Sequence, residues 1–171
     1  MTELPTIITD SREQRPWAFD NLHIRGIKSL PTVRGTLRTG DYSIQGLENL
    51  VCIERKSAED LYGTLVGGHD RFSRELERMR AFKYKYLVIE SSPTSFIKYV
   101  DHWRDFSKLD TIFQSLCTWP LEFGVRPRWC KDRAAAVDYV ARLALHICEE
   151  EKGEMPWSIV PADSICLSSR V

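Results

Sequence analysis

Two neighbouring segments, Gly40-Asp41 and the apolar stretch 50–56, most constrain what this chain can fold into. The stretch 50–56 reads Leu-Val-Cys-Ile-Glu-Arg-Lys, which is typical of a buried β-strand. Successive side chains of a strand point to opposite faces, so Glu54 and Lys56 share one face and Arg55 lies on the other. Asp41 is expected at the end of the preceding strand. Two carboxylates and one lysine therefore meet at the rim of a sheet.

The residue types at this rim are those of a hydrolytic metal site. Ionised carboxylates with open coordination positions suit Mg²⁺, which keeps several waters and binds phosphate oxygens of a substrate. A neighbouring lysine can orient or activate the attacking water and offset developing charge. Asp41, Glu54 and Lys56 thus point to phosphodiester hydrolysis, with Mg²⁺ as cofactor and Mn²⁺ as a possible substitute. A core strand without such a role has no reason to place an acid and a lysine two residues apart beside a second acid.

Composition indicates one soluble globular domain. The chain has 171 residues, 43% of them hydrophobic and 28% charged. Its apolar runs are far shorter than a membrane span, and the N-terminus lacks the pattern of a signal peptide. The five cysteines are widely spaced and form no C-x-x-C pair, so we expect reduced thiols in an intracellular protein, cytoplasmic if the host is a prokaryote or phage. No membrane partner is expected.

The formal net charge of zero is a poor match to a strong nucleic-acid binder, but basic residues cluster between positions 71 and 85. They form either a solvated helix face with ion pairs along the helix, or a stripe that faces phosphate beside the metal site. The sequence leaves both interpretations open. The clustered residues are Arg71, Arg74, Arg78, Arg80, Lys83 and Lys85.

The order of strands and helices predicts an α/β fold, a mixed central sheet flanked by helices. Strands 37–45 and 50–56 are expected to pair antiparallel around a turn at 46–49. Asp70 and Asp132 are expected to cap the second and last helices. The core spans about residues 6–150, and the tail 152–171 shows no clear pattern. The predicted strands are 6–10, 37–45, 50–56, 86–90 and 125–129, and the predicted helices are 57–66, 70–82, 94–104, 109–123 and 133–151.

Several of these residues also have a structural interpretation. Ser57 and Asp60 satisfy the capping-box pattern at the start of a helix, and we favour a helix cap over catalysis for this pair. Asp10 taken alone resembles a solvated turn acid. Arg55, which points away from Glu54, is expected to pair with Asp60 or with a distant acid.

The motifs named so far resemble the nuclease domain of the XPF-type structure-specific endonucleases, a branch of the restriction-endonuclease-like fold. The resemblance covers about residues 6–150. The paired Gly-Asp and Glu-Arg-Lys elements at this spacing form a specific signature. The matching motifs are Asp10-Ser11-Arg12-Glu13, Gly40-Asp41-Tyr42, Glu54-Arg55-Lys56-Ser57-x-x-Asp60, Gly68-x-x-Arg71-Phe72 and Leu87-Val88-Ile89-Glu90.

This resemblance implies metal-dependent cleavage of branched, flapped or forked DNA near junctions of duplex and single strand. Asp41 and Glu54 would bind the metal with help from Asp10, Glu13 would complete the acidic cluster, and Lys56 would serve the attacking water. Phosphate contacts would come from the motif arginines and from the basic helix that follows. These arginines are Arg12, Arg55, Arg71, Arg74 and Arg78.

Two departures from the family pattern affect what can be expected. Relatives usually carry a tandem helix-hairpin-helix module after the nuclease domain, and no such signature follows Glu151, so a homodimer or a partner protein is expected to supply DNA affinity. Glu75 stands where many relatives have glutamine. Two alternatives remain: a restriction-like or Holliday-junction-resolving nuclease of the same fold, and a non-catalytic DNA-binding or scaffold module.

Overall fold

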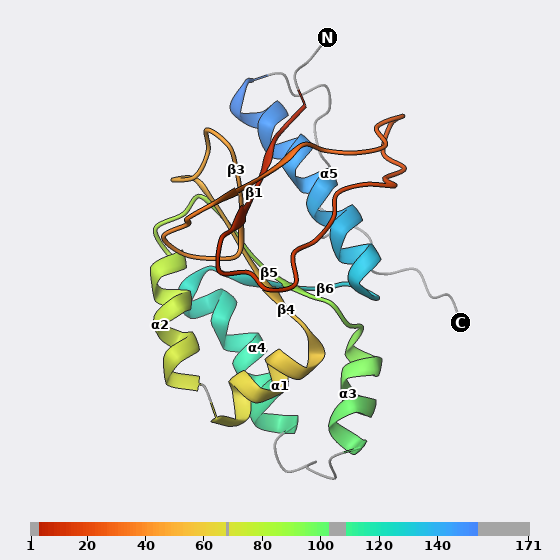
Figure 1. The fold of residues 1–171 in the computed structure, drawn as a ribbon. Helices are drawn as coiled ribbons and strands as arrows, with labels where there is room; N and C mark the ends of the chain where they lie inside the picture. Colours follow the sequence, from red (N-terminus) through yellow and green to blue (C-terminus); the bar gives the residue numbers. More distant parts are fainter. Residues whose placement is uncertain (1–3, 68, 103–108, 154–171) are drawn as a thin grey trace, which may run out of the picture.

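A computed structural model describes residues 4–67, 69–102 and 109–153, without the side chains of His69 and His102. A mixed six-stranded sheet in the order β2-β1-β3-β4-β5-β6 forms its centre (Figure 1). The predicted α/β fold with a mixed sheet and flanking helices is confirmed. The strands are β1 (Ile7–Asp10), β2 (Thr32–Gly35), β3 (Tyr42–Ile44), β4 (Val51–Lys56), β5 (Tyr84–Ile89) and β6 (Arg126–Trp129).

The predicted antiparallel pair before the Glu-Arg-Lys motif is present as β3 and β4. β3 has only three residues, because the chain loops through positions 36–41 before pairing. Asp41 therefore directly precedes a strand and does not end one. β4, β5 and β6 run parallel, whereas β1 pairs antiparallel with β3 and parallel with β2. The edge strand β2 was not predicted, since its Thr-Val-Arg-Gly sequence is short and exposed.

All the predicted helices are present, with small differences at their ends. α2 begins at His69, so Asp70 lies in its first turn and does not cap it, and α2 ends before the predicted residue 82. The predicted cap of α5 is confirmed, since Asp132 accepts a hydrogen bond from the Ala135 amide at 2.9 Å. Residues 103–104 of the predicted third helix and the tail from 154 lie outside the described residues. The helices are α1 (Ala58–Gly67), α2 (His69–Met79), α3 (Pro93–His102), α4 (Leu109–Phe123) and α5 (Arg133–Glu151).

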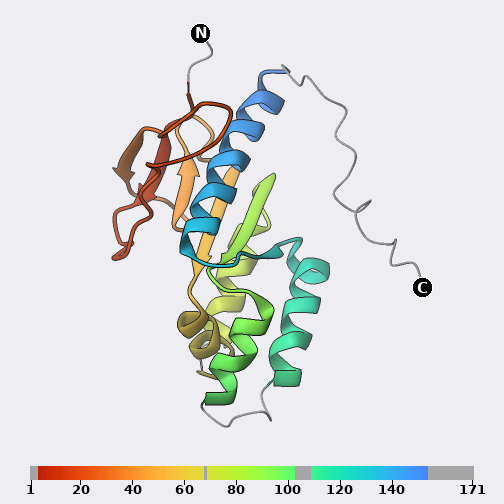
Figure 2. The ribbon, with the colours of Figure 1, turned by 90° about the vertical axis from the view of Figure 1, so that its right-hand side faces the viewer.

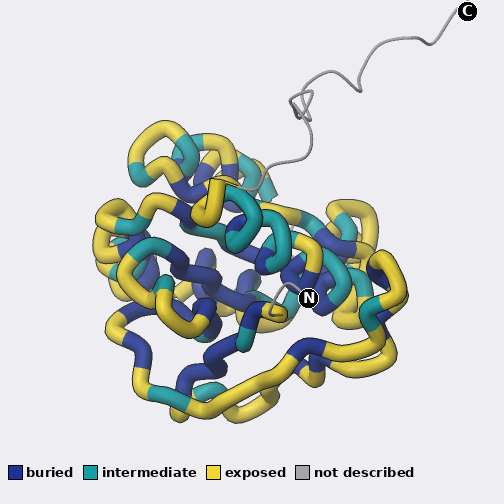
Figure 3. The backbone as a smooth tube through the Cα atoms, turned by 90° about the horizontal axis from the view of Figure 1, so that it is seen from above, coloured by how far each residue is buried: buried dark blue, intermediate teal, exposed yellow. Residues whose placement is uncertain are grey.

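The two faces of the sheet are covered by different elements, which separates two hydrophobic clusters. α5 and residues 17–30 pack on the face that carries Tyr42, Ile53 and Val88. Helices α1 to α4 pack on the face that carries Cys52 and Leu87. Figures 1 and 2 show α5 beside β1 and β3, with the other helices gathered together at the opposite end of the molecule. Figure 3 shows the buried segments in the interior, surrounded by exposed turns.

This arrangement confirms the predicted alternation along β4. Ile53 and Arg55 face the α5 side, and Cys52, Glu54 and Lys56 face helices α1 to α4. None of the described helices is long and apolar enough to cross a membrane. The described cysteines Cys52, Cys117, Cys130 and Cys148 are free thiols.

Candidate active site

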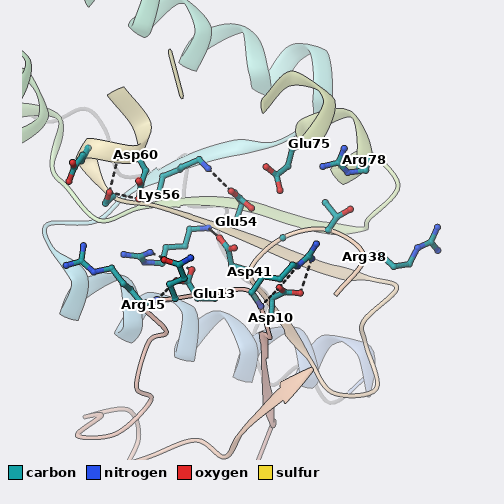
Figure 4. Close-up of a pocket in the computed structure, with 17 residues that line it drawn as sticks. Asp10, Glu13, Arg15, Arg38, Asp41, Glu54, Lys56, Asp60, Glu75 and Arg78 are labelled. Atoms are coloured by element: carbon teal, nitrogen blue, oxygen red, sulfur yellow. Dashed lines mark hydrogen bonds and ion pairs between the residues drawn. The ribbon is translucent and has the colours of Figure 1, made fainter. Parts of the chain in front are cut away.

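A polar cleft of about 410 Å³ opens where β4 ends, between the loop before β3 and helix α2. The segment after β1 and the start of α1 complete its wall (Figure 4). All five residues predicted as catalytic line this cleft: Asp10, Glu13, Asp41, Glu54 and Lys56. The fold therefore brings together positions that are far apart in the sequence.

Gly40 allows the tight turn that delivers Asp41 to the cleft. Its φ angle is +81°, a left-handed conformation that residues with a Cβ rarely adopt. A Cβ at this position would lie 2.7 Å from Cys52 Sγ and 3.0 Å from Ile53 O, both in β4. The Asp41 amide then donates to Ile53 O at 2.9 Å, so the backbone of the acid is tied to the strand that carries Glu54.

The Asp41 carboxylate is held close to the Glu-Arg-Lys motif. Its Oδ2 accepts a hydrogen bond from the Arg55 amide at 2.8 Å. Burial, with a smaller contribution from the charges of Glu13 and Glu75, raises the pKa of Asp41 to about 6, although the hydrogen bond from the Arg55 amide acts in the opposite direction. A half-buried acid whose ionised form is disfavoured in this way is a candidate ligand for a cation.

Glu54 and Lys56 form a buried ion pair at the end of β4. Lys56 Nζ donates to Glu54 Oε1 at 2.8 Å and lies 4.5 Å from the centre of the Phe72 ring. Burial and the charge of Asp41 raise the pKa of Glu54 well above its usual range. Burial alone would lower the pKa of Lys56, but the contact with Glu54 outweighs it and raises that pKa.

The residues present fit a divalent cation at this site. Glu54 is only 3% exposed, and its Oε2 atom has no hydrogen-bond partner. A buried carboxylate oxygen without a donor is costly unless a cation contacts it. In the described part of the chain, no group of three or more histidine, cysteine, aspartate or glutamate residues could hold a metal ion. The ligands would thus be the pair Asp41 and Glu54, which suits Mg²⁺ because that ion takes few protein ligands and retains water.

The structure does not support Asp10 as a metal ligand or catalytic acid. Both carboxylate oxygens are occupied: Oδ1 accepts from the Arg12 amide and Nε, and Oδ2 accepts from Arg12 Nη2 and the Leu37 amide. Burial alone would raise the pKa of Asp10, but these hydrogen bonds lower it to about 2. Asp10 therefore fixes the segments around Arg12 and Leu37 and shapes the wall of the cleft.

Arg55 was predicted to contact phosphate; it lines the cleft, but its guanidinium is already paired with acids. Its guanidinium is buried and donates to Glu90 from Nε at 2.9 Å and from Nη2 at 2.8 Å. Glu13 lies 3.6 Å from Arg55 Nη1 and accepts from the Arg15 amide at 2.6 Å. The partner of Arg55 is thus a distant acid, as one of the two alternatives predicted, and not Asp60. The catalytic role of Glu13 stays a prediction.

The other predicted phosphate ligands fall into two groups. Arg12 and Arg78 line the cleft, whereas Arg71 and Arg74 are exposed on α2 and do not line it. The cleft residues that were not predicted as site residues include Arg38 and Glu75. Glu75 and Arg78 are three residues apart and share one face of α2, but this spacing is common in helices and does not by itself identify the acid as a site residue.

The structure contains the hydrogen bonds of the predicted helix cap. The Ser57 hydroxyl accepts from the Asp60 amide at 3.0 Å and donates to Asp60 Oδ2 at 2.7 Å. α1 begins at the next residue, Ala58. The two residues also line the cleft, so the cap fixes the start of α1 beside Lys56.

Residues 9–143 match the family described as the ERCC4 domain. The chain belongs to the ERCC4 domain family. It is 32% identical over 143 residues to the DNA repair endonuclease XPF of Cricetulus griseus, and 36% identical over 87 residues to the DNA repair endonuclease UVH1 of Arabidopsis thaliana. These matches cover 81% and 50% of this chain but only 15% and 8% of the relatives.

Two solved structures share the fold of this ERCC4 domain. XPF from Aeropyrum pernix superposes with a TM-score of 0.65 at 19% identity, covering 98% of this chain and 69% of the other. The same protein in complex with DNA gives a TM-score of 0.62 at 17% identity, covering 86% and 66%. The restriction-endonuclease-like fold predicted from the sequence agrees with this similarity.

Proposed function

We propose that this chain is a metal-dependent DNA endonuclease that hydrolyses phosphodiester bonds in branched, flapped or forked DNA. The observation that carries the proposal is the unpartnered Oε2 of buried Glu54, which lies in the cleft with Asp41 and Lys56. A purely structural ion pair would satisfy both oxygens of its carboxylate. The proposed cofactor is Mg²⁺, with Mn²⁺ as a substitute.

In this mechanism the side chains of the cleft have separate roles. Asp41 and Glu54 hold the cation, which when bound supplies a Lewis acid for the scissile phosphate. The ammonium group of Lys56, fixed by Glu54, orients the attacking water and offsets the negative charge that develops in the transition state. Lys56 acts as a cation and not as a base, because Glu54 raises its pKa.

The substrate class rests on the family and its named members. The relatives are named DNA repair endonucleases, and one solved neighbour is a complex with DNA. This chain spans 15% of the length of the first relatives it matches, so substrate choice and assembly are part of the proposal. A second copy of the chain or a partner protein is proposed to add DNA affinity.

A cleavage panel tests this function. Labelled flap, fork, nicked, single-stranded and four-way substrates are incubated with the purified chain in Mg²⁺, Mn²⁺ or EDTA. Mg²⁺-dependent incision near the junction of flaps or forks supports the proposal. Preference for four-way junctions or for intact duplex would assign the chain to the alternative nuclease classes, and no metal-dependent cleavage of any substrate would leave a non-catalytic binding module.

A further inference from the structure

A second groove of about 360 Å³ adjoins the catalytic cleft. Its wall is formed by the loop before Asp41, by Asn49 and by the last turn of α2 with the residues that follow it. Arg38, Thr39 and Arg78 line both hollows, so the two share one rim. In Figure 4, Arg38 and Arg78 lie at the same end of the cleft, although they come from the loop and from α2.

The guanidinium groups of the two rim arginines are not paired with an acid in the described part of the chain. Both are exposed, and neither makes a hydrogen bond or ion pair within the described ranges 4–67, 69–102 and 109–153. By contrast, Glu77, the acid that lines the groove, is paired with Arg80, whose Nη1 lies 3.1 Å from Glu77 Oε2. Several cleft cations are also engaged, such as Lys56 with Glu54 and Arg55 with Glu90. Arg38 and Arg78 therefore leave unpaired positive charge where the cleft meets the groove.

The chemistry of this rim suits a phosphate group. A guanidinium presents planar forked donors that match the oxygens of a phosphodiester, and two of them can bind one phosphate or its neighbour. Solvated surface arginines without a ligand are common, and Arg71 and Arg74 of α2 fit that description. Arg38 and Arg78 differ because separate segments bring them together beside a hollow that leads away from the catalytic acids.

We infer that Arg38 and Arg78 form a phosphate clamp for the nucleotide next to the scissile phosphate, and that the adjoining groove carries the DNA strand away from the active site. This inference rests on the proposed nuclease function. The clamp holds backbone and reads no base, so it sets the path of the strand and not the sequence that is cut.

Fluorescence anisotropy with a labelled forked DNA in EDTA tests the clamp over a series of salt concentrations. The proteins compared are the full chain, Arg38→Ala, Arg78→Ala, the double variant and Arg142→Ala. Arg142 is the charge-matched control, because it pairs with Asp138 on α5 and lines neither hollow. Circular dichroism confirms that each variant is folded.

Each clamp variant is expected to bind about tenfold more weakly, as for the loss of one hydrogen-bonded charge. The slope of log Kd against log salt should fall by about one for each arginine and about two for the double variant, with no change in Arg142→Ala. Equal affinity and slope in the double variant and the full chain would overturn the clamp even if the full chain cleaves DNA. If the arginine variants show the slope change but the full chain cleaves no DNA in Mg²⁺, the clamp is supported and the nuclease proposal is refuted.

Discussion

The backbone amide of Arg55 donates a hydrogen bond to Asp41 Oδ2 at 2.8 Å, which joins the two motifs of the candidate active site. The side chain of the same arginine is anchored on the other face of the sheet by Glu90. Arg55 thus positions an acid with its main chain and is itself positioned by a second acid. This relationship makes the geometry of the cleft depend on Glu90, which does not line it.

The turn at Gly40 gives a first prediction. Gly40→Ala places a Cβ against Cys52 Sγ and Ile53 O and adds strain at a φ of +81°, so it should displace Asp41. We expect a loss of unfolding free energy of more than about 1–2 kcal/mol, the usual cost of the left-handed conformation, and a large drop in cleavage rate. Gly46→Ala is the matched control, because Gly46 has a φ of +84° with no atom near its Cβ position. Urea denaturation that gave the same change for both variants would contradict the packing argument.

The buried pair of Arg55 and Glu90 gives a second prediction. Glu90 is the main partner of buried Arg55, so its removal leaves that guanidinium largely unpaired. Glu90 also accepts hydrogen bonds from Arg133 and from the Trp17 indole, which are lost as well. Glu90→Ala should lower the unfolding free energy by about 3–5 kcal/mol, as for an uncompensated buried charge. Glu151→Ala, which removes an exposed pair with Lys83, should cost much less, because solvent screens exposed ion pairs. Chemical denaturation of the two variants measures the difference, and similar losses would argue against an anchoring role for Glu90.

The alternation along β4 shows what the sequence could predict. Period two placed Glu54 and Lys56 on one face and Arg55 on the other, because strand geometry is local. The partner of Arg55 was not predictable in the same way. Glu90 reaches it only because β5 pairs in parallel register with β4, with Lys56 beside Ile89.

The interpretations of Asp10, Arg38 and Glu75 required the tertiary structure. Motif position indicated Asp10 as a ligand, but Arg12 and the Leu37 amide of the following loop together occupy its carboxylate oxygens. Arg38 lies in an irregular loop, where no periodic pattern in the sequence indicates the side to which a side chain points. Glu75 has an ordinary helical spacing, and only the packing of α2 against the end of β4 brings it to the cleft.

The hydrogen bonds of Asp10 predict a specific acid response. Its pKa is lowered to about 2 in the folded chain, so between about pH 4 and 2 the unfolded chain binds more protons than the folded one. The stabilisation from Asp10 is therefore complete above pH 4 and is lost as the pH falls through this window. Thermal unfolding from pH 5 to 2 should show a smaller decline for Asp10→Asn than for the unmodified chain. An identical decline would show that Asp10 is not held in this way.

The role of Asp60 can be separated from catalysis. Asp60→Asn keeps an oxygen that can accept from the Ser57 hydroxyl, and Ser57 still accepts from the backbone amide of residue 60. A helix-cap role predicts a stability change below about 1 kcal/mol and a cleavage rate near that of the unmodified chain. A loss of about a hundredfold or more in a folded protein would instead place Asp60 among the groups that contact the reacting phosphate.

The central claim is that Asp41 and Glu54 hold a cation for phosphodiester hydrolysis. The most direct measurement is single-turnover cleavage of a forked DNA by the unmodified chain, Asp41→Asn and Glu54→Gln, each in Mg²⁺ and in EDTA. We predict cleavage by the unmodified chain in Mg²⁺ alone, and a loss of about 10²–10³-fold or more in both variants with folding and DNA binding retained. Cleavage by the unmodified chain at the same rate in EDTA, or full activity in either folded variant, would contradict the claim.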